Sequence, residues 1–262
     1  MKQMQVYTTQ LQAGLGLVHE TRLLLDIWQS GMTPTDLKLE ALRSGQFPNV
    51  TARRLRNVVI ECFAPRYLVQ DGAPATFLKK LIKSLSTHEL TQVFFLYTSR
   101  ANLILADFVR QVYWERYAAG GDLVAKDDVK AFIRRGIDDG KTTKRWSEST
   151  ITRVANYLLG CCADYGLLGQ RTLSGRHIVP FRIEPKVTAY IAHDLHFSGM
   201  GDNGVTASSD WQLFGMTRSD VRDELKRLSL KGYFIHQSAG DITHISWKHK
   251  SMEAFVDVLS EG

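Results

Sequence analysis

A helix followed by a glycine, bulky apolar residues and two short β-rich runs is predicted twice in the second half of the chain. No other feature of the sequence constrains the fold as strongly. In the first copy, a helix over 151–165 leads through Gly166 to a hairpin that turns at 173–176, with its second strand over 177–183. This order of elements is typical of a winged-helix unit, in which a β-hairpin follows a helix-turn-helix.

The second copy has the spacing that a helix-turn-helix requires. Trp211 lies four residues before Gly215, the predicted turn, and a helix with one apolar face is predicted over 219–231. A hairpin that turns at 238–241 follows, and residues 242–247 alternate between apolar and polar. We therefore interpret this segment as a second winged-helix-like unit.

The first 120 residues show helical periodicity and none of the alternation typical of strands. Thr51 is a predicted helix cap, and Pro74 lies where the first turn of another helix is expected. The sequence thus predicts a mainly α protein. An all-helical domain over 1–120 is followed by two winged-helix-like units, over 121–184 and 185–262.

The positive charge of the chain is unevenly distributed. The 262 residues include 33 Lys and Arg against 27 Asp and Glu, a formal net charge of +6. The excess lies in 51–184, with 21 basic and 13 acidic residues, whereas 185–262 has 8 basic and 10 acidic residues. Such an excess permits nucleic-acid binding without requiring it.

The predicted second helix of 185–262 has an apolar face and, beside it, a basic stripe of the size that a major groove accepts. Asp223 borders this stripe and weakens its potential. Charged stripes are often no more than solvated helix faces, and winged helices also dock proteins. The candidate DNA contacts of this helix are Arg218, Ser219, Arg222 and Lys226.

Further candidate DNA contacts lie in the basic part of the chain. One group precedes or follows the predicted cap Ser147, where helix amides favour an anion. A second group lies on the predicted wing, and a third opens the helix after Thr51, where solubility is an equally simple explanation. In order, the three groups are Lys141, Lys144, Arg145 and Arg153; Arg171 and Arg176; and Arg53, Arg54 and Arg56.

The sequence contains motifs similar to those of enzymes, but the predicted elements around them are not the ones that such motifs require. Residues 199–204 spell GxGxxG, but a dinucleotide site must leave a strand, whereas this segment follows a predicted helix and is expected to be a loop. No metal-ligand set or catalytic constellation has a recognisable context. We expect a protein without enzymatic activity, metal, cofactor or small-molecule substrate.

The chain also lacks a predicted transmembrane segment and a signal peptide, so we expect no membrane association and a cytoplasmic location. Three cysteines, without a regular framework, fit reduced thiols.

Two stretches resemble the BrxA family, the small non-enzymatic component of bacterial BREX phage-defence systems. They are YTTQLQAGLGLVHETRLLLDIWQSGM over 7–32 and TARRLRNVVIECFAPRYL over 51–68. The layout of two winged-helix patterns behind a helical region is similar to that family as well. The resemblance implies an accessory protein that binds double-stranded DNA and acts with a BREX methyltransferase, an ATPase and other subunits.

Our hypothesis is a non-enzymatic, double-stranded DNA-binding BREX accessory protein that contacts mainly phosphates and so has little sequence selectivity. Two alternatives stay open. A winged-helix transcriptional regulator would show a strong preference for one operator. A protein-docking scaffold would use both units to hold partners and would not bind DNA.

Overall fold

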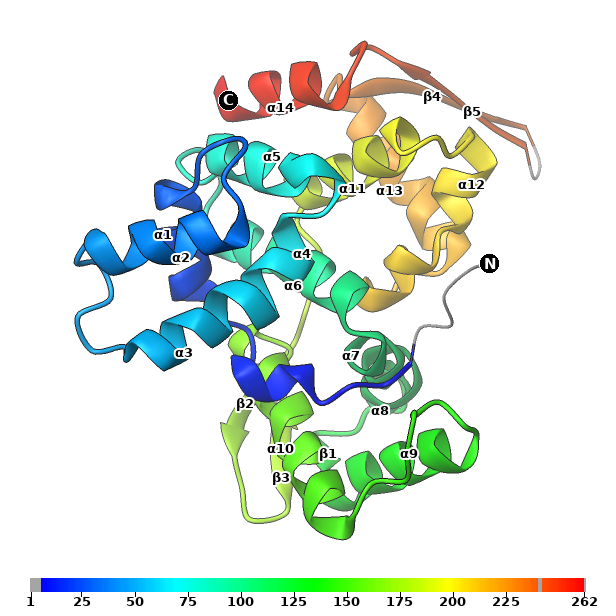
Figure 1. Cartoon of the computed structure of the whole chain (residues 1–262). Coiled ribbons are helices and arrows are strands. Elements are labelled where there is room, and N and C mark those ends of the chain that lie inside the picture. The colour runs from blue at the N-terminus through cyan, green and yellow to red at the C-terminus, as the bar shows by residue number, and fades with distance from the viewer. Residues whose placement is uncertain (1–5, 240–241, 262) are drawn as a thin grey trace. The chain divides into compact units, whose positions relative to one another are not determined.

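In a computed structural model, residues 6–239 and 242–261 of the chain are described (Figure 1). The chain forms two compact units, and each is built from two separate stretches. Unit 1 comprises residues 6–79 and Phe94–Phe181, and unit 2 comprises Lys80–Val93 and residues from Arg182 onward. Two of the three boundaries fall within helices, α5 (Ala73–Leu81) and α6 (Thr87–Ala101), and the third precedes α11 (Pro185–Phe197). The predicted division into three consecutive segments stays a prediction.

Unit 1 begins with helices, as the periodicity of the first 120 residues predicts. Apolar side chains at helical spacing, such as Leu55, Val59 and Phe63, are fully or almost fully buried between these helices. After α1 to α5, the chain returns to this unit in α6 and continues to α8. The elements are η1 (Gln10–Ala13), α1 (Val18–Ile27), α2 (Pro34–Arg43), α3 (Ala52–Asn57), η2 (Val58–Phe63), α4 (Ala64–Tyr67), η3 (Gln70–Gly72), α7 (Leu103–Phe108), η4 (Val109–Tyr113) and α8 (Trp114–Ala118).

Two of these helices each contain a widened turn. The segments η2 and η4 are π-helical, and each continues directly into the α-helix on either side. The segments α7, η4 and α8 therefore form one continuous helix with a π turn in its middle. Because a π turn holds an additional residue, it shifts the phase of the helix face that follows.

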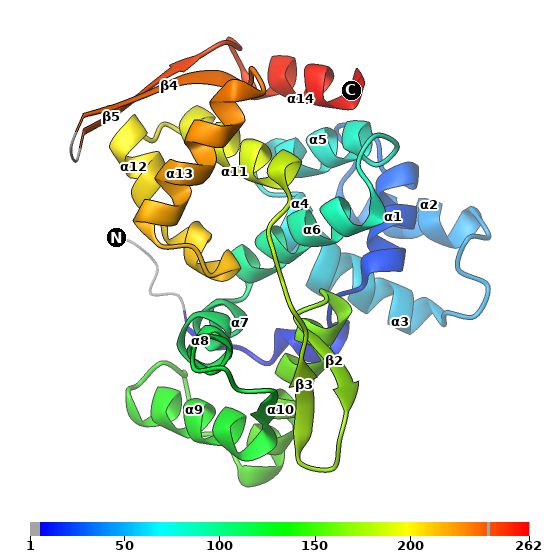
Figure 2. The same ribbon diagram turned by 180° about the vertical axis from the view of Figure 1, so that it is seen from behind.

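The remainder of unit 1 is a small sheet with two helices (Figure 2). Strand β1 (Leu123–Ala125) leads into α9 (Lys126–Asp138) and α10 (Glu148–Asp164), and the chain then forms a hairpin. Strands β2 (Leu168–Arg171) and β3 (Gly175–Ile178) make this hairpin, and the sheet order is β1-β3-β2, antiparallel throughout.

Three details of this sheet differ from the prediction. Strand β1 was not expected, because three residues are too short for a period-2 pattern to emerge. The hairpin turn spans 172–174 rather than 173–176, since Gly175 already pairs with Ala125. Strand β3 ends at Ile178 rather than 183, and Pro180, which has no N–H to donate, follows two residues later.

Unit 2 contains helices around a long two-stranded hairpin. The buried Gln92 of α6 holds the backbone of residues 182–184, where the chain enters unit 2. Its amide oxygen accepts from Glu184 N at 2.9 Å, and its amide nitrogen donates to Arg182 O at 2.8 Å. In addition to the start of α6, the elements are α11 (Pro185–Phe197), α12 (Asp202–Ala207), η5 (Ser209–Phe214), α13 (Arg218–Leu230), β4 (Phe234–Ala239), β5 (Ile242–Trp247) and α14 (Met252–Glu261).

The GxGxxG segment is not the loop that we expected. Helix α12 begins inside it at Asp202, with Gly201 in the extended cap conformation. The Asp202 carboxylate accepts hydrogen bonds from Ile245 N at 2.9 Å and from Trp247 Nε1 at 3.1 Å, so the start of α12 is fixed to strand β5. Such a contact, over more than 40 residues of sequence, is invisible to local pattern analysis.

The coarse prediction is confirmed: the protein is mainly helical, with small antiparallel sheets. The predicted helices over 151–165 and 219–231 correspond to α10 and α13, within three residues at each end. The turn predicted at 238–241 lies partly outside the described residues.

Candidate nucleic-acid interface

Helix α10 buries one face and exposes the other. Ser147 caps it by accepting from Thr150 N at 3.3 Å, as predicted, and Ile151 and Val154 are buried. Arg153 is exposed on the opposite face, where its guanidinium lies 3.4 Å from Thr150 Oγ1. The exposed side of the first turns of α10 is therefore available to an external partner.

The loop before α10 contains the predicted residues Lys144 and Arg145, and both are exposed. Arg145 lies 3.8 Å from the carboxylate of Asp138, a long and solvent-exposed contact that contributes little. Arg134 and Glu148, which the prediction did not consider, form a closer pair at 2.7 Å, and this contact lowers the pKa of Glu148. The acidic group at the start of α10 is thus neutralised locally.

Lys141 differs from the other residues of this group because its charge is already paired. Its Nζ donates to Asp107 Oδ2 at 2.9 Å and to the Tyr7 hydroxyl at 3.3 Å, and only 35% of the side chain is exposed. The Tyr7 amide also donates to the Lys141 carbonyl at 2.6 Å. Burial, and the hydrogen bond to Asp107, raise the pKa of Tyr7. Lys141 therefore anchors the loop, which is a structural role.

The hairpin of unit 1 brings Arg171 and Arg176 directly opposite each other. Arg171 is exposed, whereas Arg176 is half-buried and donates to Gly169 O at 2.9 Å. Lys126, at the start of α9, donates from Nζ to the carbonyl of Leu173 in the turn at 2.9 Å. Three cationic side chains thus surround the end of this hairpin, of which the sequence analysis had identified two.

The third predicted group lies on α3. Thr51 caps this helix by accepting from Arg54 N at 3.2 Å, as expected, and Arg53, Arg54 and Arg56 are all exposed. The Arg54 guanidinium donates to the carbonyl of Ala13 and so connects α3 to η1. Basic residues in the first turn oppose the helix dipole, so helix stability does not explain this cluster.

In unit 2, α13 has the predicted division into two faces. Val221, Leu225 and Leu228 are fully buried, and Thr217 with Asp220 forms a capping box at the N-terminus. The hydrogen bonds from Thr217 lower the pKa of Asp220.

The four predicted DNA contacts of α13 differ in how exposed their side chains are. Arg218, Ser219 and Lys226 are exposed, whereas Arg222 is half-buried and therefore less accessible. Arg218 already donates to Asn203 Oδ1 at 3.3 Å.

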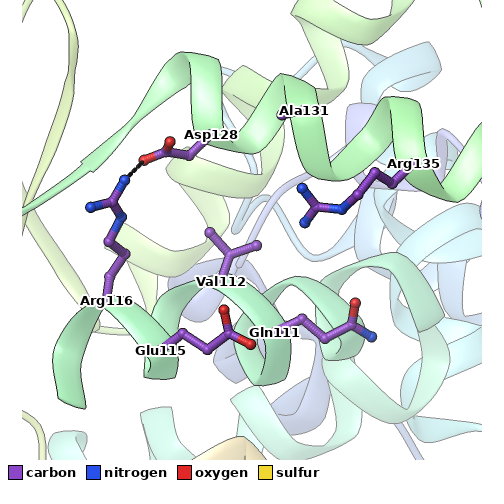
Figure 3. A pocket seen from close by; sticks show the side chains of 7 residues that line it. All are labelled: Gln111, Val112, Glu115, Arg116, Asp128, Ala131 and Arg135. Carbon is purple, nitrogen blue, oxygen red and sulfur yellow. Dashed lines mark hydrogen bonds and ion pairs between the residues drawn. The ribbon is translucent and has the colours of Figure 1, made fainter. Parts of the chain in front are cut away.

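A polar hollow of about 360 Å³ lies between η4–α8 and α9, and the sequence analysis missed it (Figure 3). The ion pair of Arg116 with Asp128, at 2.7 Å, closes one end, while the side chains of Glu115 and Arg135 point into the gap. Charges of both signs line it, so it does not select one charge type. No sequence signal could have found it, because its lining residues come from two separate helices.

Among the described residues, no group of three or more His, Cys, Asp or Glu side chains is placed to hold a metal ion. The cysteines are buried and free of disulfides, and burial raises the pKa of Cys161 to about 12. Among the same residues, no helix combines the length and apolarity needed to cross a membrane.

The two stretches that resemble a known family meet in unit 1. The buried Arg66 donates to the carbonyls of Leu15 at 2.8 Å and Gly16 at 3.2 Å, and the Tyr165 hydroxyl donates to Gly16 O at 2.9 Å. The BrxA family model matches residues 5–194 of the chain. The chain belongs to the BrxA family. This membership associates it with BREX phage-defence systems. No curated protein sequence matches it.

The BrxA match covers some of the candidate residues and not others. All candidate residues of unit 1, from Arg53 to Arg176, lie inside it. The match ends within α11, so α13 and its basic residues lie outside it.

Proposed function

We propose that this BrxA-family chain is a non-enzymatic accessory protein that binds double-stranded DNA within a BREX phage-defence system. The observation that carries the proposal is the topology of 123–178. A strand, two helices and a hairpin follow one another, and β3 lies between β1 and β2. We interpret this order as that of a winged helix, and under this interpretation the second helix, α10, would take the position of a DNA-recognition helix.

The charges around α10 support a DNA partner for this unit. Lys144 and Arg145 precede the helix, Arg153 lies on its exposed side, and Arg171 extends from the hairpin. An α-helix fits the major groove, and basic side chains on the flanking loop and hairpin are then close to phosphates. Because most of these groups are suited to phosphates, we expect strong salt dependence and little sequence preference.

Unit 2 supports a second candidate function, protein docking. We interpret the order of its elements α11 to β5 as winged-helix-like too, but residues 185–262 contain more acidic than basic residues. Exposed apolar side chains also occur there, namely Leu230 on α13, Ile235 on β4 and Val258 on α14. We therefore propose that unit 2 contacts another BREX subunit and contributes little to DNA affinity.

A salt titration tests the proposal directly. Binding of the full chain is measured to a random DNA duplex, a labelled single strand and a duplex RNA. We expect preferential DNA-duplex binding that weakens by about 10³-fold between 50 and 200 mM salt, as several phosphate contacts require. Absence of duplex binding at low salt would contradict the proposal and favour the docking scaffold for both units.

A matched pair of charge-reversal variants locates the surface. Lys144→Glu with Arg153→Glu should weaken duplex binding by about 10- to 100-fold, because two phosphate contacts are lost and repulsion replaces them. Arg43→Glu with Lys83→Glu changes the net charge equally, at exposed positions outside the proposed surface. Equal losses in both variants would show that net charge alone, and not α10, governs binding.

A further inference from the structure

Leu173, in the turn between β2 and β3, is the most exposed large apolar side chain of the described residues. It is 98% exposed, and the next is Leu230 at 87%. Exposed at this level, it contributes nothing to the core of unit 1. An isolated exposed leucine needs no explanation by itself. Its surroundings, however, indicate a specific use.

The backbone of this turn is fixed from three sides. Thr172 N donates to Gly175 O at 2.9 Å, and Gly175 N donates to Thr172 Oγ1 at 3.0 Å, which closes the turn. Lys126 N donates to Ser174 O at 2.7 Å, and its Nζ donates to Leu173 O at 2.9 Å. A side chain added at Gly175 would lie 2.0 Å from the Val124 carbonyl oxygen, so β3 lies tightly against β1. The leucine is therefore presented from a rigid support.

Cationic groups surround this apolar tip. Arg171 and Arg176 lie opposite each other at the base of the turn, and Lys126 Nζ donates to the main-chain carbonyl of Leu173. Asp127, which directly follows Lys126 in the sequence, is exposed and lies 3.8 Å from Lys130. A narrow hairpin with an apolar end and cationic sides is complementary to the minor groove of duplex DNA. Phosphates line the edges of that groove, and the space between stacked bases is apolar.

We propose that Leu173 enters the minor groove of duplex DNA and inserts between two stacked base pairs, while Arg171 and Arg176 contact the flanking phosphates. Minor-groove proteins use leucine, among other apolar residues, as a wedge of this kind, and it kinks the duplex by about 20–90°. The cost of unstacking is smallest at pyrimidine–purine steps such as TA. This inference rests on the proposed function, because it assigns a contact within the same DNA complex.

The test is a duplex of 20–30 base pairs in which 2-aminopurine replaces adenine at TA steps. Unstacking of this base raises its fluorescence, and dyes at the two duplex ends report a kink as increased energy transfer. At saturating wild-type protein both signals should increase. Leu173→Ser should abolish both increases while lowering affinity by only about 3- to 10-fold, because the unstacking cost offsets much of the burial gain. Leu173→Met should retain both.

The following outcomes distinguish the insertion of Leu173 from the proposed DNA binding on which it rests. Leu230→Ser, at a comparably exposed leucine of unit 2, should leave both signals unchanged. Duplex binding by the wild type without either signal, or signals that persist in Leu173→Ser, would overturn the wedge and leave the proposed function standing. Failure of the wild type to bind the duplex at low salt would overturn both.

Discussion

The two helix–hairpin regions of the molecule share an order of elements and differ in how the hairpin is supported. In unit 1, β3 pairs on both edges, with β1 and β2, whereas in the described residues of unit 2 β4 and β5 form a two-stranded sheet. Figure 1 shows β4 and β5 as a long hairpin, whereas β2 and β3 are four residues each. The first hairpin is therefore short and extended by a third strand, whereas the second is long and is held through backbone N–H groups of β5 by side chains of α12.

The surfaces of the two regions differ as well. Basic residues surround α10 and its hairpin, whereas residues 185–262 contain an acidic excess and exposed apolar side chains. One arrangement of elements thus presents two chemistries. The order of elements alone therefore does not determine the partner, and the surface of each region decides which partner it can bind.

The largest effect of a single substitution should come from weakening the contact between the first hairpin and β1. Gly175→Ala places a methyl group against the Val124 carbonyl, where a Cβ would lie at 2.0 Å, and should lower the stability of unit 1 by about 2–4 kcal/mol. Gly232→Ala in unit 2 meets no atom closer than 3.5 Å, and its φ of +85° should cost only about 1 kcal/mol. Hydrogen exchange resolved by unit measures both. Equal costs would show that β1 does not anchor the hairpin.

The next prediction is that acid lowers the stability of unit 2 more than that of unit 1. His193 in unit 2 is fully buried and stacks on Phe255 with ring centroids 3.5 Å apart, and burial lowers its pKa from 6.5 to about 3. Between these values the unfolded chain binds a proton that the folded unit does not. Unit 2 should therefore lose about 1.4 kcal/mol per pH unit as the pH falls from 6.5 towards 3, and keep its full stability above 6.5.

Two variants test the origin of this acid sensitivity. Urea unfolding followed over pH 4–7 should lose most of its slope in His193→Phe, which keeps an aromatic ring against Phe255. His177→Gln, at an exposed histidine of unit 1, should leave the slope unchanged. A slope that persists in His193→Phe would assign the acid sensitivity to His196, His236 or His249, whose pKa values burial also lowers.

The smallest effect is expected from the basic side of α13. Arg218→Glu with Lys226→Glu should reduce duplex affinity by no more than about 3-fold, because these exposed groups make at most weak, screened contributions in an acidic unit. The comparison with Lys144→Glu and Arg153→Glu uses the same charge change, measured by the same titration. A loss of tenfold or more would give α13 a direct part in DNA binding.

The sequence predicted features that depend on neighbouring residues. The buried face of α13, with Val221, Leu225 and Leu228, follows from periodicity, and the caps Thr51 and Ser147 follow from their side-chain chemistry. These features form within one or two helical turns, so a local pattern contains most of the information.

What the sequence did not predict depends on distant contacts. Strand β1 exists because β3, about 50 residues later, pairs with it. The charge of Lys141 is compensated by Asp107, and its Nζ also donates to the Tyr7 hydroxyl, but no local pattern connects either residue to Lys141. The burial of Arg222 likewise depends on packing against neighbouring elements, since α13 lies beside β4. The sequence thus predicted on which element each basic residue lies, but not whether its charge is exposed and unpaired enough to bind a partner.

The π turns η2 and η4 have a consequence for how this chain tolerates changes of length. A π turn contains one residue more than the α-helical turn that it replaces. Deletion of one residue within Val58–Phe63 or Val109–Tyr113 would restore a regular α-helix without rotating the helix beyond it. The same deletion within α10 would turn every later side chain by about 100° and move part of its buried face out of the core. These two turns are therefore the helical positions at which length can vary while the arrangement of the flanking side chains is kept.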